Sequence, residues 1–449
     1  MSFPRYPAYK DSGVEWLGEV PSHWHVSALK REYSVTLGKM LQTDASSPED
    51  VLGPYLRAAN IQWSGVDASD IKTMWLSGRD VLQLRLLPGD LLISEGGDVG
   101  RSCLWQGELE ECYFQNSVNR VRPINGGSSR FLYYWMSTIK DKGYVDVLCN
   151  KSTIAHFTAE KVAAVPVPIP PNGEQESIAH FLNIETAKID ALVAEQEQLI
   201  TLLKEKRQAV ISHAVTKGLD PSVPMKDSGV EWLGVVPAHW DVHGIKHIVS
   251  TPITDGPHES PAFPDEGIPF VSAEAVSTGV IDFDRIRGFI SEEDHARYSL
   301  KYKPKRGDIF MVKSGATTGV TAMVDTDMDF NIWSPLAVIR AAAFMSPHYV
   351  LQFMRSLNFQ EAVTLNWSFG TQQNIGMGVI ENLSIAVPPL AEQEAISGHL
   401  RQLLDQFQPL ISEATQAIQL LQERRSALIS AAVTGQIDVR GLALAKEAA

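Results

Sequence analysis

Hydrophobic residues recur at heptad spacing over two long stretches of the chain. The first stretch has two rows of such positions, one at Leu182, Ile189, Gln196, Leu203 and Val210 and one at Leu192 and Leu199. The second stretch repeats both rows, at Leu400, Phe407, Ala414, Leu421 and Leu428 and at Leu403, Leu410 and Ala417. This spacing predicts two long helices that pair as an antiparallel coiled coil. Separate packing of each helix on a globular core remains an alternative.

The ends of the first helix are marked by helix-breaking residues. Pro170, Pro171 and Gly173 precede it and Gly218 follows it. The stretch from Glu174 to Thr216 would span about 65 Å at the helical rise of about 1.5 Å per residue. The second helix contains Pro409, so we expect a kink or a break at that position.

The regions before each helix, 26–165 and 242–385, carry short apolar runs that predict strands. Leu91–Ser94 follows a Gly-Asp turn, and Ile309–Val312 follows a second one. Phe131–Ser137 and Tyr349–Ser356 have the pattern of short amphipathic helices. The fold class is therefore α/β, with two globular domains that are each followed by one long helix.

The chain contains a long internal repeat. Lys10 to Trp24 (KDSGVEWLGEVPSHW) returns as Lys226 to Trp240 (KDSGVEWLGVVPAHW), with thirteen identities in fifteen positions. Leu202 to Asp220 returns as Leu420 to Asp438, with eleven identities in nineteen. The repeat indicates a tandem duplication whose halves form a pseudo-twofold object. We expect the repeated Trp and Leu residues to pack each globular domain against the helices.

Composition is that of an ordinary globular protein. Of 449 residues, 44% are hydrophobic and 20% charged, and the sequence shows neither a signal peptide nor a membrane span. We therefore expect a cytoplasmic protein without membrane contact. Cys103, Cys112 and Cys149 form no C-x-x-C pair, so buried, inert thiols are expected.

Charge gives little support to broad contact with nucleic acid. The formal net charge is −14; residues 1–165 hold 17 basic and 19 acidic groups, and residues 226–385 hold 12 and 19. Neither domain is basic, so DNA contact would use local patches or share the phosphates with a more basic partner.

Enzyme motifs are missing from the sequence. There is no G-x-x-x-x-G-K-[ST], G-x-G-x-x-G or H-E-x-x-H motif. The sequence Asp70-Ile71-Lys72 resembles one fragment of a nuclease site, but no clear second acidic partner accompanies it, so we interpret it as surface charge. We predict no catalytic residue and no metal site.

Two glycine-rich loops follow the predicted strands at equivalent places. Glycines allow backbone N–H groups to approach phosphates, and adjacent cations and hydroxyls complete such contacts. A plain turn between strands explains the loops equally well. The candidate DNA contacts in these loops are Gly97 and Arg101 in the first half and Lys313, Ser314, Thr317 and Thr318 in the second.

Two polar loops precede the long helices. Asn and Gln pair with adenine edges and Lys with guanine, although an ordinary polar loop would have the same composition. The candidates are Lys151, Ser152 and Thr153 in the first loop and Thr371, Gln372, Gln373 and Asn374 in the second.

Two further segments carry candidate contacts. The basic run from Arg297 to Arg306 includes Lys301 and Lys303 and suits either a solvated face or phosphate contact. The segment with Arg57, Asn60 and Gln62 lies where the other half has Phe270–Ala275, with Ser272 in place of Arg57. Different polar residues at equivalent positions are what two surfaces that recognise different sequences would show.

The repeated KDSGVEWLG segment, the Gly-Asp-led strands, Gly370–Ile375 (GTQQNI) and Pro388–Ile396 before a long helix resemble the DNA specificity subunit of type I restriction-modification systems. The resemblance covers nearly the whole chain. It implies two target recognition domains joined by two antiparallel helices, each domain recognising one half of a bipartite, asymmetric DNA site. The first half differs by having Ser152-Thr153-Ile154-Ala155 in place of the Gly-Thr-Gln-Gln run.

The resemblance also implies partners. Double-stranded DNA, two modification subunits that use S-adenosylmethionine and two restriction subunits that use ATP and Mg²⁺ would bind a chain that holds no cofactor itself. A coiled-coil adaptor without a DNA role, and a nuclease or methyltransferase with an unrecognised site, remain alternatives. The expected segments are 1–25 (frame), 26–165 (first recognition domain), 166–225 (helical spacer), 226–241 (repeated frame), 242–385 (second recognition domain), 386–440 (helical spacer) and 441–449 (tail).

Overall fold

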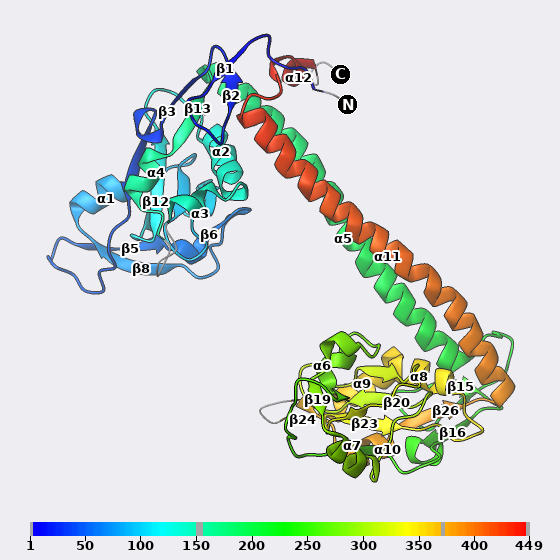
Figure 1. Cartoon of the computed structure of the whole chain (residues 1–449). Helices are drawn as coiled ribbons and strands as arrows, with labels where there is room; N and C mark the ends of the chain where they lie inside the picture. Colours follow the sequence, from blue (N-terminus) through cyan, green and yellow to red (C-terminus); the bar gives the residue numbers. More distant parts are fainter. Residues whose placement is uncertain (1–2, 150–155, 370–372, 446–449) are drawn as a thin grey trace. The chain divides into compact units, whose positions relative to one another are not determined.

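Each half of the chain folds around a four-stranded antiparallel sheet with a three-stranded sheet beside it (Figure 1). The computed structural model describes residues 3–149, 156–369 and 373–445. Two compact units result, one formed by Met1–Gln196 with Gln416–Ala449 and the other by Glu197–Thr415. The first unit is therefore built from both ends of the chain, and the second from one continuous segment.

The sheets of the first unit have the orders β10-β9-β12-β4 and β11-β5-β8. Their strands are β4 (Tyr33–Leu37), β5 (Val51–Leu56), β8 (Lys72–Leu76), β9 (Leu91–Ser94), β10 (Ser102–Leu104), β11 (Tyr113–Phe114) and β12 (Val118–Pro123). Three strand pairs complete it: β1 (Tyr9–Asp11) with β2 (Glu19–Pro21), β3 (His25–Ala28) with β13 (Pro166–Ile169), and β6 (Ile61–Gln62) with β7 (Gly65–Val66). The helices are η1 (Leu29–Arg31), η2 (Ala58–Asn60), α1 (Gly78–Leu84), α2 (Ser129–Asp141), α3 (Tyr144–Leu148) and α4 (Ala159–Ala164).

The second unit repeats this arrangement, with the orders β17-β23-β20-β21 and β19-β18-β22. Its strands are β17 (Thr254–Asp255), β18 (Ile268–Val271), β19 (Gly288–Ile290), β20 (Ile309–Val312), β21 (Thr321–Met323), β22 (Asn331–Ile332) and β23 (Leu336–Ile339). The strand pairs are β14 (Met225–Asp227) with β15 (Val235–Pro237), β16 (Asp241–Gly244) with β26 (Ser384–Val387), and β24 (Ser368–Phe369) with β25 (Gln373–Asn374). The helices are η3 (Ile245–His247), η4 (Phe283–Arg285), α6 (Ala273–Val276), α7 (Glu292–Ser299), α8 (Pro347–Arg355), α9 (Leu357–Leu365) and α10 (Met377–Asn382).

Pairing direction is the same in both units. β9 and β20 are the fully buried central strands, each antiparallel to its two neighbours. The side sheets each contain one parallel pair, β11 with β5 and β22 with β18. The predicted α/β class, the strands after the Gly-Asp turns and the two aromatic helices are therefore confirmed.

Two long helices, α5 (Asn172–Lys217) and α11 (Leu390–Val433), connect the globular parts, and α12 (Arg440–Ala445) follows. In the first unit the beginning of α5 packs beside the end of α11, as the Asp190–Arg425 ion pair shows. In the second unit the end of α5 lies in one core with the beginning of α11, through Ile211 and Leu400. The helices are thus antiparallel in each unit, as predicted.

Pro409 does not break α11, which is helical without interruption from Leu390 to Val433. Of the kink or break expected at Pro409, the break is therefore wrong, and the kink stays a prediction. A proline removes one N–H donor from a helix, but the bonds on either side hold the segment when it also packs laterally. Burial of Phe407 and Ala414 on the packed face supplies that support.

The first of the two predicted heptad rows is more deeply buried than the second. Leu182, Ile189, Leu400 and Leu428 are buried, whereas Leu192, Leu199 and Leu410 of the second row are between 42% and 47% exposed. Leu403 and Ala417 of the second row are half-buried, so this row lies at the edge of the packed face in the part that the structure describes.

The repeated segment joins each globular domain to the helices. Trp24 is fully buried, and its Nε1 donates to Oε1 of Glu174 at 2.9 Å, while His23 Nε2 lies 2.8 Å from Oε2 of the same residue. In the second unit His239 Nε2 lies 2.8 Å from Glu392 Oε2. The expected architectural packing of the repeat is confirmed.

The glutamine that follows each of these glutamates makes the same hydrogen bonds in both units. Gln175 accepts from the backbone N–H of Ser128 at 2.9 Å, and Gln393 accepts from that of Ser346 at 2.8 Å. Each amide group also donates to a proline carbonyl, that of Pro170 at 3.0 Å and that of Pro388 at 2.9 Å. The glutamines therefore fix the start of each long helix against the globular domain.

The two ends of the chain meet in the core of the first unit. The Tyr9 hydroxyl donates to the carbonyl of Gly435 at 3.0 Å, and the Asp438 N–H donates to the carbonyl of Pro4 at 2.8 Å. Trp24 and Val433 belong to the same buried cluster.

Candidate nucleic-acid interface

In the second unit, the structure brings two of the predicted DNA-contacting segments together. The Lys313–Gly319 loop joins β20 to β21, and its Gly315 N–H donates to the carbonyl of Gln373 at 3.0 Å. Ser314 forms an isolated antiparallel bridge with Asn374, and the Ile375 N–H donates to the carbonyl of Lys313 at 2.8 Å. The glycine loop and the polar loop thus form one surface, although Thr371 and Gln372 lie outside the described residues.

The first unit has the same junction. The Phe157 N–H donates to the carbonyl of Glu95 at 2.9 Å, as Ile375 does to Lys313. The candidates Lys151, Ser152 and Thr153 lie outside the described residues. Gly97 has a φ of 71° with open space around it, which fits a loop whose backbone approaches a ligand.

Glu95 and Lys313 occupy the same position in the two units, so the loops have opposite charges at their base. The Glu95 N–H donates to the carbonyl of Ser117 at 2.9 Å, and the Lys313 N–H donates to that of Pro335 at 2.8 Å. Burial raises the pKa of Glu95, and nearby His156 lowers it less.

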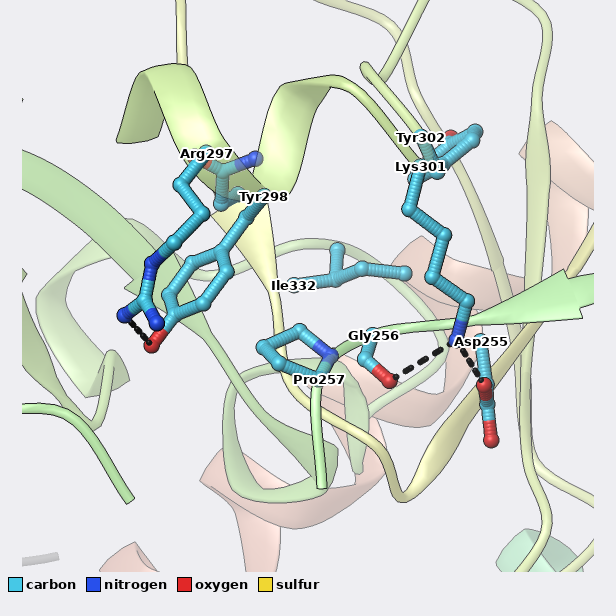
Figure 2. Close-up of a pocket in the computed structure, with 9 residues that line it drawn as sticks. Asp255, Gly256, Pro257, Arg297, Tyr298, Lys301, Tyr302 and Ile332 are labelled. Atoms are coloured by element: carbon cyan, nitrogen blue, oxygen red, sulfur yellow. Dashed lines mark hydrogen bonds and ion pairs between the residues drawn. The ribbon is translucent and has the colours of Figure 1, made fainter. Parts of the chain in front are cut away.

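Two lysines and one histidine surround the carboxylate of Asp255, near the Lys313–Gly319 loop. Its carboxylate, on β17, lies 2.7 Å from Lys301 Nζ, 2.6 Å from Lys313 Nζ and 3.0 Å from His258 Nε2. Burial alone would raise the pKa of Asp255, but hydrogen bonds from both lysines hold it below its ordinary value. Figure 2 shows Lys301 reaching Asp255 and the carbonyl of Gly256.

Three more cations of the basic run are also paired, whereas Lys305 forms no ion pair within the residues that the structure describes. Lys303 Nζ lies 2.8 Å from Asp329, Arg297 is 2.8 Å from Glu259, and Arg306 is 2.8 Å from Asp327. These pairs are largely exposed, so each contributes little to stability. Apart from Lys305, the run therefore presents paired charges, and not the continuous cationic stripe that phosphate contact would favour.

Arg57 and Lys72 share one carboxylate in the first unit. Arg57 forms an ion pair with Asp70, and Lys72 Nζ lies 2.7 Å from the same residue. The hydrogen bond from Lys72 is the largest cause that lowers the pKa of Asp70. Asp70 is exposed, as its interpretation as surface charge predicted.

Asn60 is corrected from a candidate base contact to a structural residue. It is 3% exposed; its Oδ1 accepts from the Arg57 N–H at 3.0 Å and its amide donates to the carbonyl of Asp67 at 2.8 Å. Its amide also donates to the carbonyl of Asp70 at 3.3 Å, so both amide protons are used inside the protein and neither is left for a base edge. Sequence pattern could not distinguish this use from base contact.

Two other candidates are mostly buried. Ser272 is 6% exposed; Thr318 is 8% exposed, and its hydroxyl donates to the carbonyl of Gly315 at 2.7 Å. Arg57 directly follows β5 and precedes η2, and Ser272 directly follows β18 and precedes α6. The two residues therefore occupy equivalent positions in the two units. Arg101 partly supports this region, because its guanidinium donates to the carbonyl of Ala58 at 3.1 Å.

The remaining candidates are accessible. Gln373 and Asn374 are exposed, Gln62 and Thr317 are half-buried, and Gln62 donates to the carbonyl of Ala59 at 2.9 Å. Asp255 is a further residue of this region that residue type alone does not reveal, although it lies in the turn Thr254-Asp255-Gly256-Pro257. Gly256 permits that turn, because a Cβ there would lie 2.2 Å from the carbonyl oxygen of Ile332.

The three thiols are buried, free cysteines, and burial raises the pKa of Cys103 to about 12. Across residues 3–149, 156–369 and 373–445 no group of three His, Cys, Asp or Glu side chains is placed to hold a metal ion. In the same ranges no helix has the length and apolar character needed to cross a membrane.

Comparison with known proteins adds a family. Residues 83–202 and 258–419 match the family model described as "Type I restriction modification DNA specificity domain". The chain is 23% identical over 435 residues to the type I restriction enzyme EcoKI specificity subunit of Escherichia coli strain K12, covering 94% of this chain and 90% of that one. It is 21% identical to the putative MjaX specificity subunit of Methanocaldococcus jannaschii, covering 94% and 96%.

Solved structures share the fold. One chain, from work described as the structural basis of complex assembly and conformational transition of the type I R-M system, matches with a TM-score of 0.65 and 17% identity, covering 92% of this chain and 98% of that one. The HsdS subunit from Thermoanaerobacter tengcongensis matches with a TM-score of 0.51 and 16% identity, covering 93% and 98%.

Proposed function

Because the chain belongs to the family of the type I restriction modification DNA specificity domain, we propose that it recognises a bipartite, asymmetric DNA site, one half-site with each globular domain. The observation that carries this proposal is one scaffold used twice with different side chains at equivalent places. Glu95 in the first unit corresponds to Lys313 in the second, and Arg57 corresponds to Ser272. Each pair occupies the same position in the same pattern of strands. Identical domains would recognise a symmetric site; these two would not.

The helices set the spacing in this proposal. Two recognition domains would meet major-groove faces about one helical turn apart, roughly 34 Å. Deleting the heptad from Glu195 to Thr201 should change the preferred spacer or abolish binding. An unchanged spacer with full activity would contradict this role of the helices.

The partners follow from the same assignment. We propose that two modification subunits using S-adenosylmethionine and two restriction subunits using ATP and Mg²⁺ assemble on this chain, which itself supplies no catalytic residue. The exposed leucines of the helices, Leu192, Leu199, Leu202, Leu410 and Leu420, offer apolar surface for such subunits. Those subunits would also share the DNA phosphates, which offsets the acidic charge of this chain. We also propose a cytoplasmic location, where the complex would meet its DNA ligand.

Methylation of DNA by the purified chain together with its modification subunit tests the proposal. Sequencing of the modified DNA should give a motif of two specified parts separated by an unspecified spacer. Exchanging residues 242–385 for those of another family member should change one part only. Changes in both parts would contradict independent recognition, and absence of sequence-specific methylation would favour an adaptor without a DNA role.

A further inference from the structure

A groove in the second unit is lined by two arginines and by no carboxylate side chain. It has a volume of about 440 Å³ and is lined by α5, α8 and α9, by Gln408 near the middle of α11, and by the segments 277–280 and 319–321. Arg207 and Arg355 line it together with Gln208, Gln360 and Gln408, and none of its lining residues is Asp or Glu.

Arg355 is held firmly in this groove. Its guanidinium donates to the carbonyl of Thr321 at 3.0 Å and to that of Gly279, while the Gln208 side chain donates to its backbone carbonyl at 2.6 Å. Burial, with a smaller contribution from the charge of Arg207, lowers the pKa of Arg355 to about 10. The Arg355 guanidinium therefore stays charged at neutral pH, and the positive charge of Arg207 acts against it.

The duplication supplies an internal comparison. Arg207 on α5 corresponds to Arg425 on α11, at the offset of 218 residues that relates the two halves. Arg425 Nε donates to Oδ1 of Asp190 at 2.8 Å, but the position that corresponds to Asp190 is Gln408. Arg207 has therefore lost the carboxylate that its counterpart keeps.

A second exchange adds charge to the same groove. Arg355 corresponds to Ser137, which lines the equivalent groove of the first unit together with Asp141 and Arg425. The first groove contains Asp141 and an arginine paired with Asp190, whereas the second contains two arginines and glutamines. The difference is specific to one half of a duplicated scaffold.

We propose that this groove binds a backbone phosphate of the DNA beside the half-site of the second domain. This rests on the proposed function, because the groove adjoins two of the candidate DNA-contacting segments. Ser277 and Thr278 follow α6, and Gly319 ends the glycine loop, where its carbonyl accepts from Gln360 at 2.9 Å. A phosphate accepts paired N–H bonds from a guanidinium and relieves the repulsion between two of them.

Two substitutions test the phosphate site in the assembled complex. Arg207→Gln removes one cation from a half-buried helix position, and Gln408→Asp restores the carboxylate that the first half has. Each should weaken binding of a short fluorescent duplex equally for the recognised and a scrambled sequence. Each should also make the slope of log affinity against log salt shallower by about 0.9, the loss of one phosphate contact.

Matched variants separate this effect from folding and from general charge. Arg425→Gln makes the same change in the first half and should leave the salt slope unchanged. Arg207→Lys retains the charge and should retain the slope. Thermal unfolding should show that Arg207→Gln and Arg425→Gln both remain folded.

The outcomes distinguish the possibilities. An unchanged slope in Arg207→Gln and Gln408→Asp, with a selective wild-type complex, would overturn the phosphate site only. So would a loss of affinity for the modification subunit with unchanged DNA affinity, because the anion would then be a partner's carboxylate. A wild-type complex without sequence preference would contradict the proposed function itself.

Discussion

The ammonium group of Lys313 lies 2.6 Å from the Asp255 carboxylate, which Lys301 approaches at 2.7 Å on its other oxygen. One buried carboxylate thus holds two cations at the base of the loop that meets the Gln373 segment. If this loop contacts DNA as we propose, the phosphates would compete with Asp255 for these lysines, and this competition would limit binding that depends on charge alone.

Removing that carboxylate should strengthen non-specific binding. In Asp255→Asn, Lys301 and Lys313 lose their partner, so affinity for a scrambled duplex should rise and the salt slope should steepen by about 1. Fluorescence anisotropy of the assembled complex at several salt concentrations measures both. Glu231→Gln removes the same charge from the exposed repeat segment; an equal effect there would show that only net charge matters.

The ion pair of Asp308 with Arg340, whose counterpart in the first unit is Asp90 with Arg122, should be a major stabilising contact of the second unit. Asp308 is 1% exposed; its two oxygens accept from Arg340 Nε and a terminal guanidinium nitrogen, each at 2.7 Å. Asp308→Asn should destabilise the unit by about 3 kcal/mol, because Arg340 would keep its charge without its partner. Urea unfolding measures this, and Asp327→Asn, at an exposed pair, should leave the midpoint unchanged.

Glu95 should make the first unit sensitive to pH. Since burial raises its folded-state pKa above the ordinary 4.5, its contribution to stability is full below pH 4.5 and is lost as the pH rises through the folded-state value. Glu95→Gln should therefore stabilise the unit at neutral pH and flatten the dependence above pH 4.5. Hydrogen exchange of β9 peptides measures this, and an unchanged pH profile would contradict it.

Trp24 and Trp240 offer a comparison of one hydrogen bond. Both side chains are fully buried, but Nε1 of Trp24 donates to Glu174, whereas Nε1 of Trp240 has no hydrogen-bond partner among the described residues. Replacing either by Phe removes similar packing. Trp24→Phe should cost about 1–2 kcal/mol more, because it leaves a buried carboxylate short of one donor. Hydrogen exchange in each unit measures the loss in free energy of unfolding that each substitution causes. Equal losses would show that the hydrogen bond of Trp24 has no net effect on stability.

Much of the fold could be predicted because the duplication marks equivalent elements twice. The strands at Leu91 and Ile309 and the long helix from Asn172 follow from local patterns of apolar residues and turns. The continuity of α11 through Pro409 could not, because lateral packing decides whether a helix tolerates a proline. The exposure of Leu192 and Leu199 likewise depends on how many helices share the stripe.

The candidate site was less predictable. The sequence placed the glycine loop and the polar loop on separate segments, and only tertiary hydrogen bonds such as Gly315 to Gln373 join them. Residue type also failed to separate Asn60, which is used internally, from Gln373, which is exposed. Asp255 and its lysines come from three separate segments, so their meeting could not be inferred from spacing.

The meeting of both chain ends in the first unit has a consequence for biosynthesis. The second unit comprises one continuous segment, Glu197–Thr415, and can complete its core as soon as that segment leaves the ribosome. The first unit must wait for Gln416 and the residues after it, since Val433 and Val439 belong to its core. The N-terminal domain is thus the last to be finished, and premature termination near the C-terminus would damage the domain that was synthesised first.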